Sequence, residues 1–342
     1  MKELRRIQKT GGATYIISLP KRWIKQQGLN VGDIIAIEPL PDGNLILSPY
    51  RFEETKIHRE AVLEANPKES VDVLIRNFVA YYLVGYDSIK VLFKEGMRQH
   101  KEALKNFVRE KLIGAEVIEE SAKHVLIQCI VRYNELPLKK TLERMSVLAE
   151  FMIDDAIRAF IDFDKDLAEE VIRRDNDVDR FYLYAVRQLK QLISNVRAKL
   201  PEEIKRPREF LGYRIVVKSI ERVADHAARI ASSANRLEKC ISEDLGKIFL
   251  SLSRNVRAIF REAVTSFLER DLSSSHRVIN KSVEFSRKCE SLLLKILSNA
   301  DARTAAMLSL VLDSIKRIAD YSADIAEIAL NLSIETLRKR SQ

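Results

Sequence analysis

The sequence predicts an α+β multidomain protein: an N-terminal β-rich module, a small α+β middle region and a C-terminal, all-α pair of three-helix bundles. Three observations predict it. β-Branched runs separated by turn dipeptides fill the start of the chain. Helix-like and strand-like segments alternate in the middle, and amphipathic helices with an internal repeat fill the rest. We expect the domains to span residues 1–51, 52–137, 138–240 and 241–342.

The N-terminal module is predicted from two β-branched runs and the residues that separate them. The runs are Tyr15-Ile16-Ile17 and Ile34-Ile35-Ala36-Ile37, whose composition is typical of strands. Between them, Pro20 suits the first turn of a helix, and Gly28 suits its end. We therefore expect a short helix between two strands.

Turn dipeptides complete this pattern. Gly32-Asp33 precedes the second run, and Asp42-Gly43 lies before a last strand over 44–48. The order of Leu19-Pro20, a short helix and a Gly-Asp turn into a strand resembles the AbrB/SpoVT swapped-hairpin DNA-binding fold. The resemblance covers nearly the whole segment. It implies a barrel that is completed only between two chains, so we expect a homodimer that matches twofold DNA sites.

The charge of the module fits this resemblance. Residues 1–51 carry eight Lys or Arg against four Asp or Glu, a net charge of +4, within a chain of net charge +9. Such an excess can supply phosphate contacts, which dominate non-specific DNA affinity, although lysines that protect a strand edge give the same charge. We expect DNA to be bound by five basic residues: Arg5, Arg6, Lys9, Lys21 and Arg22.

The middle region is predicted as a small α+β unit. It contains helix-like periodicity and β-branched runs, but no catalytic motif. The predicted helices are 70–86 and 97–112, and the predicted strands are 88–93, 115–120 and 124–131.

An internal repeat organises the C-terminal part. The segment Ser219–Ala231 recurs as Ser314–Ala326, and with three more residues nine of sixteen positions are identical at an offset of 95. Upstream the offset is 107, which pairs Asp164 with Asp271 and places a 12-residue deletion in the second copy. A repeat longer than about 90 residues indicates a duplicated bundle rather than a solenoid.

Each copy is predicted to hold three helices, at 140–162, 165–199 and 209–237, then at 245–270, 273–298 and 302–336. The third helices carry the pattern Ser-Ile-Glu/Lys-Arg-Val/Ile-Ala-Asp, which resembles PhoU, the phosphate-uptake regulator family built from pairs of three-helix bundles. The fusion resembles archaeal phosphate-uptake regulators with an N-terminal AbrB-like domain. It implies a DNA-binding transcriptional regulator of phosphate homeostasis, in which the bundles sense or relay phosphate status.

Four carboxylates of the first copy form a candidate metal site. Asp175 and Asp179 are four residues apart on one predicted helix, and Glu221 and Asp225 have this spacing on the next, so each pair shares a helical face. Carboxylates from two facing helices suit a hard cation or iron. In PhoU relatives such motifs carry metal clusters, and the resemblance implies iron, zinc, manganese or magnesium here. The alternative is pairing with three nearby arginines: Arg174, Arg180 and Arg222.

The second copy departs from this pattern. The matching positions are Ser282, Ser286, Lys316 and Asp320, so three of the four carboxylates are replaced. Lys316 is four residues before Asp320, and an ion pair between them would satisfy the remaining carboxylate. We expect no metal site in the second bundle.

Three classes of function remain. The first is the DNA-binding regulator, and the second is an adaptor that regulates a phosphate transporter or signalling protein by protein contact without specific DNA binding. The third is a di-metal carboxylate oxidase. Such oxidases use Glu-x-x-His pairs, and none of the five histidines has a Glu three residues before it. The sequence also has no nucleophile–base constellation and no glycine-rich phosphate loop, so we expect no enzyme.

The cysteines and the hydropathy bear on location. Cys129, Cys240 and Cys289 lie far apart without a Cys-x-x-Cys, which argues against a disulfide framework or zinc finger and favours buried thiols. No apolar run approaches the ~20 residues that cross a bilayer, and no signal peptide is recognised. We expect a cytoplasmic protein without membrane insertion.

Overall fold

The computed structural model divides the chain into two compact units, residues 1–57 and 58–342. The described residues are 3–39, 43–50, 58–131, 135–194, 200–236, 241–299 and 301–337. The predicted boundary at 51/52 and Cys240 lie outside these residues.

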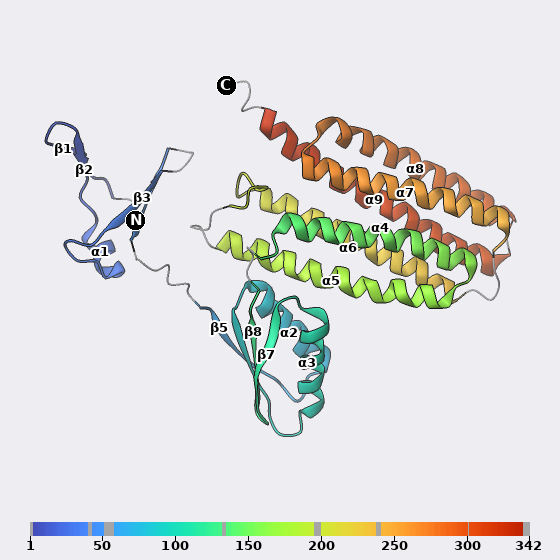
Figure 1. Ribbon diagram of the computed structural model, residues 1–342, viewed down its shortest axis with the longest axis horizontal. Coiled ribbons are helices and arrows are strands. Elements are labelled where there is room, and N and C mark those ends of the chain that lie inside the picture. Colours follow the sequence, from blue (N-terminus) through green and yellow to red (C-terminus); the bar gives the residue numbers. More distant parts are fainter. Residues whose placement is uncertain are drawn as a thin grey trace. The chain divides into compact units, whose positions relative to one another are not determined.

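The first unit consists of two antiparallel hairpins and a helix (Figure 1). Pro20 precedes the helix, and Gly28 ends it in the left-handed conformation at φ 67°, where its backbone N–H donates to the carbonyl of Lys25. The first strand was not predicted because its Gln-Lys-Thr sequence contains no apolar residue. The elements are β1 (Gln8–Thr10), β2 (Thr14–Ile16), α1 (Lys21–Gln27), β3 (Ile35–Pro39) and β4 (Leu45–Pro49).

The described residues of this unit form no hydrophobic core within one chain. Among its described residues only Ser48 is buried. Large apolar side chains on the hairpins and connections are exposed instead, among them Ile16, at 46%, and Ile37, at 60%. Their exposure leaves most of the unit's apolar surface in water, which is unfavourable by about 25 cal/mol per Å². The other exposed ones are Leu4, Ile7, Tyr15, Ile17, Val31, Ile34, Leu45 and Tyr50.

The second unit begins with a four-stranded mixed sheet of order β5-β6-β8-β7, in which β5 is parallel to β6 and the other pairs are antiparallel. Two helices pack on one face, and their Phe78 and Leu104 are fully buried with Ile89 and Ile127 of the sheet. The sheet and helices are β5 (Glu60–Glu64), α2 (Val71–Val84), β6 (Ser88–Leu92), α3 (Arg98–Lys111), β7 (Ala115–Glu120) and β8 (His124–Cys129).

The strand β5 was missed by the sequence analysis. Its residues Glu-Ala-Val-Leu-Glu are mostly good helix formers, so the local sequence does not favour a strand. The pairing with β6 decides the conformation, and Ala61 and Leu63 of β5 then point to the buried face. The other elements of this region were predicted within a few residues of their observed bounds.

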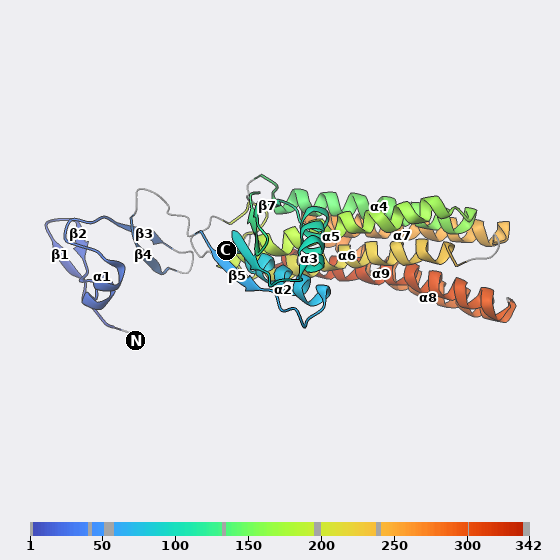
Figure 2. The ribbon, with the colours of Figure 1, turned by 90° about the horizontal axis from the view of Figure 1, so that it is seen from below.

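Six long helices form the rest of the unit and run roughly along one direction (Figure 2). The fold class that the sequence predicts is thereby confirmed, and the two helix triplets share one continuous hydrophobic core. Residues 195–199 and 237 of the predicted helices lie outside the described part. The helices are α4 (Leu138–Asp162), α5 (Lys165–Ser194), α6 (Glu209–Ala234), α7 (Glu243–Glu269), α8 (Leu272–Asn299) and α9 (Ala302–Leu337).

The repeat is visible in the contacts between α4 and α7. Glu150 of α4 accepts from Arg261 of α7 at 2.5 Å, and Asp154 of α4 pairs with Arg257 of α7. At the offset of 107, Glu150 corresponds to Arg257 and Asp154 to Arg261. The two ion pairs therefore occupy equivalent places and join the two copies.

The sheet with its two helices (residues 58–131, the sheet region) is anchored to the six long helices α4–α9 (the helical body) by Arg187 of α5. The Arg187 side chain is 5% exposed. Its guanidinium donates to the backbone carbonyl oxygens of Tyr82 and, at 2.8 Å, of Tyr86, and lies over the Tyr82 ring. Tyr82 lies in the last turn of α2, where its carbonyl also accepts from the backbone N–H of Gly85, and Tyr86 follows the end of the helix. Arg187 therefore fixes α2 against α5.

Within the described residues, none of the helices combines the length and the apolar character needed to cross a membrane. Cys289 is buried and Cys129 is partly buried, and both are free thiols.

Candidate functional site

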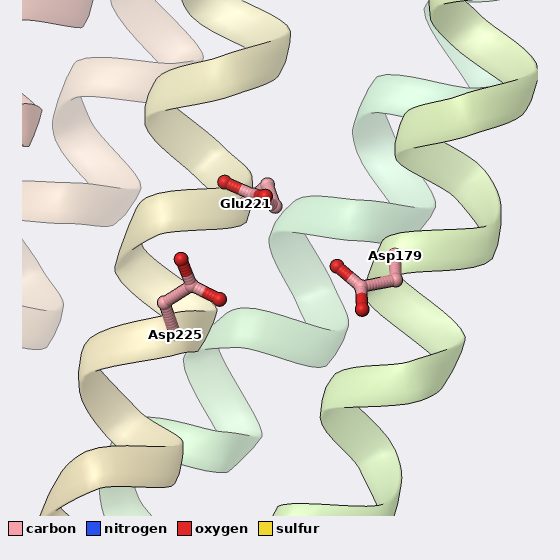
Figure 3. A group of neighbouring side chains, drawn as sticks. All are labelled: Asp179, Glu221 and Asp225. Atoms are coloured by element: carbon pink, nitrogen blue, oxygen red, sulfur yellow. The ribbon is translucent and has the colours of Figure 1, made fainter. Parts of the chain in front are cut away.

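Three carboxylates converge between α5 and α6 (Figure 3). Asp179 comes from α5, and Glu221 and Asp225 come from α6; one oxygen of each lies within 4.8 Å of the others. Figure 3 shows the Asp179 and Asp225 carboxylates directed toward each other across the two helices. Asp175 lies one helical turn before Asp179 and is close enough for its charge to interact with all three. We call these four residues the acidic cluster.

Burial makes it unfavourable for all four carboxyl groups of the acidic cluster to be ionised at once. Burial raises the pKa of Asp175 to about 7, helped by the negative charges of Asp179, Asp225 and Glu221. Burial is also the main cause that raises the pKa values of the other three carboxyls. Each shift means that the folded environment disfavours the ionised form.

Two lysines supply part of the missing positive charge. Lys218, one turn before Glu221 on α6, donates to Glu221 Oε1. Lys111 comes from the C-terminal end of α3, and its Nζ lies 3.9 Å from Asp179 Oδ2. Glu221 Oε2 and Asp175 Oδ1 are nevertheless buried without a hydrogen-bond partner.

The arginines of the alternative interpretation have other partners. Arg174 pairs with Asp155 and Glu170, and Arg180 pairs with Asp177 at 3.7 Å. Arg222 donates to the Tyr321 hydroxyl at 3.1 Å. Each of the three arginines thus has a described partner outside the acidic cluster, while the charge of Arg222 also interacts with Glu221 and Asp225.

The donor set fits a hard cation. Carboxylate oxygens are the ligands preferred by magnesium, manganese and calcium, and non-haem iron also accepts them. Two buried oxygens in the cluster have no donor, and a buried unpartnered carboxylate oxygen is costly. A cation coordinated by Asp179, Glu221 and Asp225 would satisfy this need, with Asp175 as a further ligand or hydrogen-bond acceptor.

His226 lies outside the acidic cluster, although it follows Asp225 in the sequence. Its ring is 5.7 Å from the ring of Tyr321 on α9. Burial lowers the pKa of His226 to about 4, helped by the positive charge of Arg229. The side chain belongs to the packing between α6 and α9.

The equivalent positions in the second copy form different contacts. Ser286 donates to Asp320 Oδ1 at 3.1 Å, and Lys316 pairs with Glu290 of α8. The predicted ion pair between Lys316 and Asp320 is thus replaced by two other contacts, since the lysine reaches across to the neighbouring helix. Lys316 occupies the position of Glu221 and carries the opposite charge.

The five candidate DNA-binding residues are all exposed on the first unit. Arg5 and Arg6 precede β1, Lys9 lies on β1, and Lys21 and Arg22 form the first turn of α1. Arg5 also forms an exposed ion pair with Glu3 at 2.5 Å, and pairs of this kind contribute little energy in water.

Two related helix triplets on one core, with a carboxylate cluster in the first, define a duplicated helical-bundle protein. A family model described as "PhoU domain" matches residues 142–234 and 249–329, just over half of the chain. The chain therefore belongs to the PhoU family. The N-terminal residues 8–55 match a second model, described as "Antidote-toxin recognition MazE, bacterial antitoxin".

Curated relatives agree with the larger match. The chain is 23% identical over 200 residues to the "Phosphate-specific transport system accessory protein PhoU homolog" of Clostridium acetobutylicum, a match that covers 57% of this chain and 90% of that protein. The protein of the same name from Zymomonas mobilis is 24% identical over 196 residues, covering 56% and 81%.

Solved structures show the same fold. PhoU from Pseudomonas aeruginosa superposes with a TM-score of 0.53 at 22% identity and covers 59% of this chain and 98% of its own. The phosphate transport system regulatory protein PhoU from Streptococcus pneumoniae gives a TM-score of 0.50 at 18% identity, covering 59% and 96%. The resemblance to the PhoU family with a MazE/AbrB-like N-terminal domain is thus confirmed.

Sequence reasoning did not find the two lysines at the acidic cluster. The spacing of Lys218 and Glu221, three residues apart on one helix, is a signal that predicts contact. Lys111 had no such signal, because 68 residues separate it from Asp179 and only the packing of α3 brings them together.

Proposed function

We propose that this protein is a DNA-binding transcriptional regulator of phosphate uptake, in which the PhoU-like helices sense or relay phosphate status. The observation that carries the proposal is the fusion itself: a basic MazE/AbrB-like module precedes a PhoU-family body in one chain. The relatives are named as accessory proteins of phosphate transport, and none of the names describes an enzyme. The protein would act in the cytoplasm, where its DNA is.

The proposal includes a homodimer formed through the first unit. The support is the set of exposed apolar side chains, because a module with no buried apolar residue among those described needs a partner surface. A second copy of the same module would cover these apolar side chains with its own and would double the positive charge. Two copies would then present two sets of basic residues to a twofold DNA site.

The proposal also assigns a metal ion to the acidic cluster, with iron, zinc, manganese or magnesium as candidates. The support is the convergence of three carboxylates and the two buried oxygens without donors. When bound, the ion would supply the positive charge that four carboxylates lack. Asp179, Glu221 and Asp225 would hold it, and α5 and α6 would thereby be fixed to each other.

The deciding experiment is a binding titration of the full-length protein against DNA from phosphate-uptake promoters and a scrambled control. It is run at several salt concentrations, with and without inorganic phosphate. Promoter preference that survives moderate salt supports the regulator, and a phosphate effect connects the bundles to it. The variant Arg5→Ala with Arg6→Ala should lose binding and keep the dimer mass; retained binding would contradict the assigned contacts.

The second candidate function is an adaptor that regulates a phosphate transporter or signalling protein by protein contact. The observation in its favour is that matches to the accessory proteins cover 81–90% of their length but only 56–57% of this chain. The accessory role of those proteins therefore does not require the rest of this chain. Equal binding to both DNAs that disappears near physiological salt would favour the adaptor.

A further inference from the structure

Among the described residues of the sheet region, only Lys111 contacts the acidic cluster. It ends α3, whereas all four carboxylates belong to α5 and α6 of the helical body. Its ammonium lies 3.9 Å from Asp179 Oδ2 and donates to the side-chain oxygen of Asn176. Both polar contacts described between α3 and the helical body come from this one side chain.

Lys111 and a bound metal ion would both carry positive charge, and both would contact the same carboxylate. Asp179 is its ion-pair partner and also one of the three carboxylates that converge. A cation coordinated by Asp179 would lie a few ångströms from the ammonium, and like charges at that distance repel strongly in a partly buried site. The ammonium and the metal thus compete for the same carboxylate.

We propose that Lys111 is a built-in counter-ion of the acidic cluster, so that metal binding releases the end of α3 from α5. The inference rests on the metal site of the proposed function. Because coupling between two binding events is reciprocal, removal of Lys111 strengthens metal binding to the same extent that metal weakens the Lys111 contact.

The second contact between the sheet region and the helical body gives this release a defined geometry. Arg187, eight residues after Asp179 on α5, holds α2 through the carbonyl oxygens of Tyr82 and Tyr86. That anchor contains no metal ligand, so it persists when the ion binds. The sheet region would then stay attached through α2 while α3 becomes free at its C-terminal end.

The test is a calorimetric titration of Mn²⁺ into chelator-treated, full-length protein. Mn²⁺ is the probe because it prefers carboxylate ligands. The variants are Lys111→Met, the matched control Arg109→Met, and Asp225→Asn. Arg109 is exposed on the same helix end, so its removal deletes a cation without altering the cluster. We expect Lys111→Met to bind Mn²⁺ about tenfold more tightly than the parent and Arg109→Met, and Asp225→Asn to lose binding.

A second readout is amide hydrogen exchange at residues 108–112. In the parent, Mn²⁺ should accelerate exchange at this end of α3; in Lys111→Met the exchange should be fast with or without the ion. Binding that is lost in Asp225→Asn but equal in Lys111→Met and the parent would overturn the role of Lys111 and leave the metal site standing. Absence of Mn²⁺ binding in the parent and in Lys111→Met would overturn both.

Discussion

Asp175 is the residue whose surroundings make the sharpest prediction. Burial and three neighbouring carboxylates raise its pKa from 3.8 to about 7, so the folded chain keeps a proton that the unfolded chain releases. Because the folded state binds more protons between about pH 4 and pH 7, the free energy of unfolding of the metal-free protein falls as the pH rises through that window. A bound cation would remove this fall in the free energy of unfolding, because it would stabilise the ionised carboxylates.

We expect Asp175→Asn to stabilise the metal-free protein at pH 8, with the gain disappearing toward pH 4. Since solvent reaches part of this side chain, the expected gain is about 1–2 kcal/mol rather than the full linkage value. Urea unfolding after chelator treatment measures it, with Asp177→Asn, an exposed position on the same helix, as the control. A gain that does not depend on pH would contradict the assigned protonation.

The same substitution tests the metal. Asp175→Asn and Asp225→Asn should each lower the metal content of the purified protein, since both carboxylates belong to the acidic cluster. Elemental analysis of the purified variants measures this. Unchanged metal content in both variants would remove the metal from the proposed function.

At the scale of elements, the packing of α2 on α5 depends on Arg187. The guanidinium donates to one carbonyl oxygen in the last turn of α2 and to one just after the helix, and it is almost completely buried. Loss of these charge-assisted hydrogen bonds removes the guanidinium donor from both carbonyls, although the Tyr82 carbonyl keeps the backbone N–H of Gly85.

Arg187→Met should therefore destabilise the attachment of the sheet region by about 2–4 kcal/mol. We expect earlier unfolding of residues 58–131 in denaturant and faster proteolysis between this region and α4. Lys190→Met, an exposed position on the same helix, should leave both unchanged. An unaltered midpoint in Arg187→Met would show that other contacts hold α2.

At the scale of the whole molecule, the two units differ in how they are stabilised. The second unit buries two hydrophobic cores, one between the sheet and its helices and one through all six long helices. The first unit buries none of its described apolar side chains. This contrast is the reason for our proposal that the protein assembles through the first unit.

We expect the full-length chain to be dimeric and the double variant Ile16→Asp, Ile37→Asp to be monomeric. A charge placed on each hairpin would have to be buried at the interface, which costs several kcal/mol. Light scattering after size-exclusion chromatography gives the mass, with Gln26→Asp as the exposed control on α1. A monomeric parent, or a dimer that survives both aspartates, would contradict a dimer through these hairpins.

Local signals in the sequence were enough to predict most helices, the internal repeat and part of the candidate site. Periodicity placed all six long helices within a few residues, and Pro20 and Gly28 bounded α1 because proline and left-handed glycine act through their own backbone. The 95-residue offset revealed the duplication, and the spacing of Glu221 and Asp225 placed them on one face. Tertiary structure decided what depends on distant partners: β5 became a strand by pairing, Lys316 turned to Glu290, and Lys111 reached Asp179 from another region. Such contacts follow from packing between segments far apart in the chain, which no local pattern encodes.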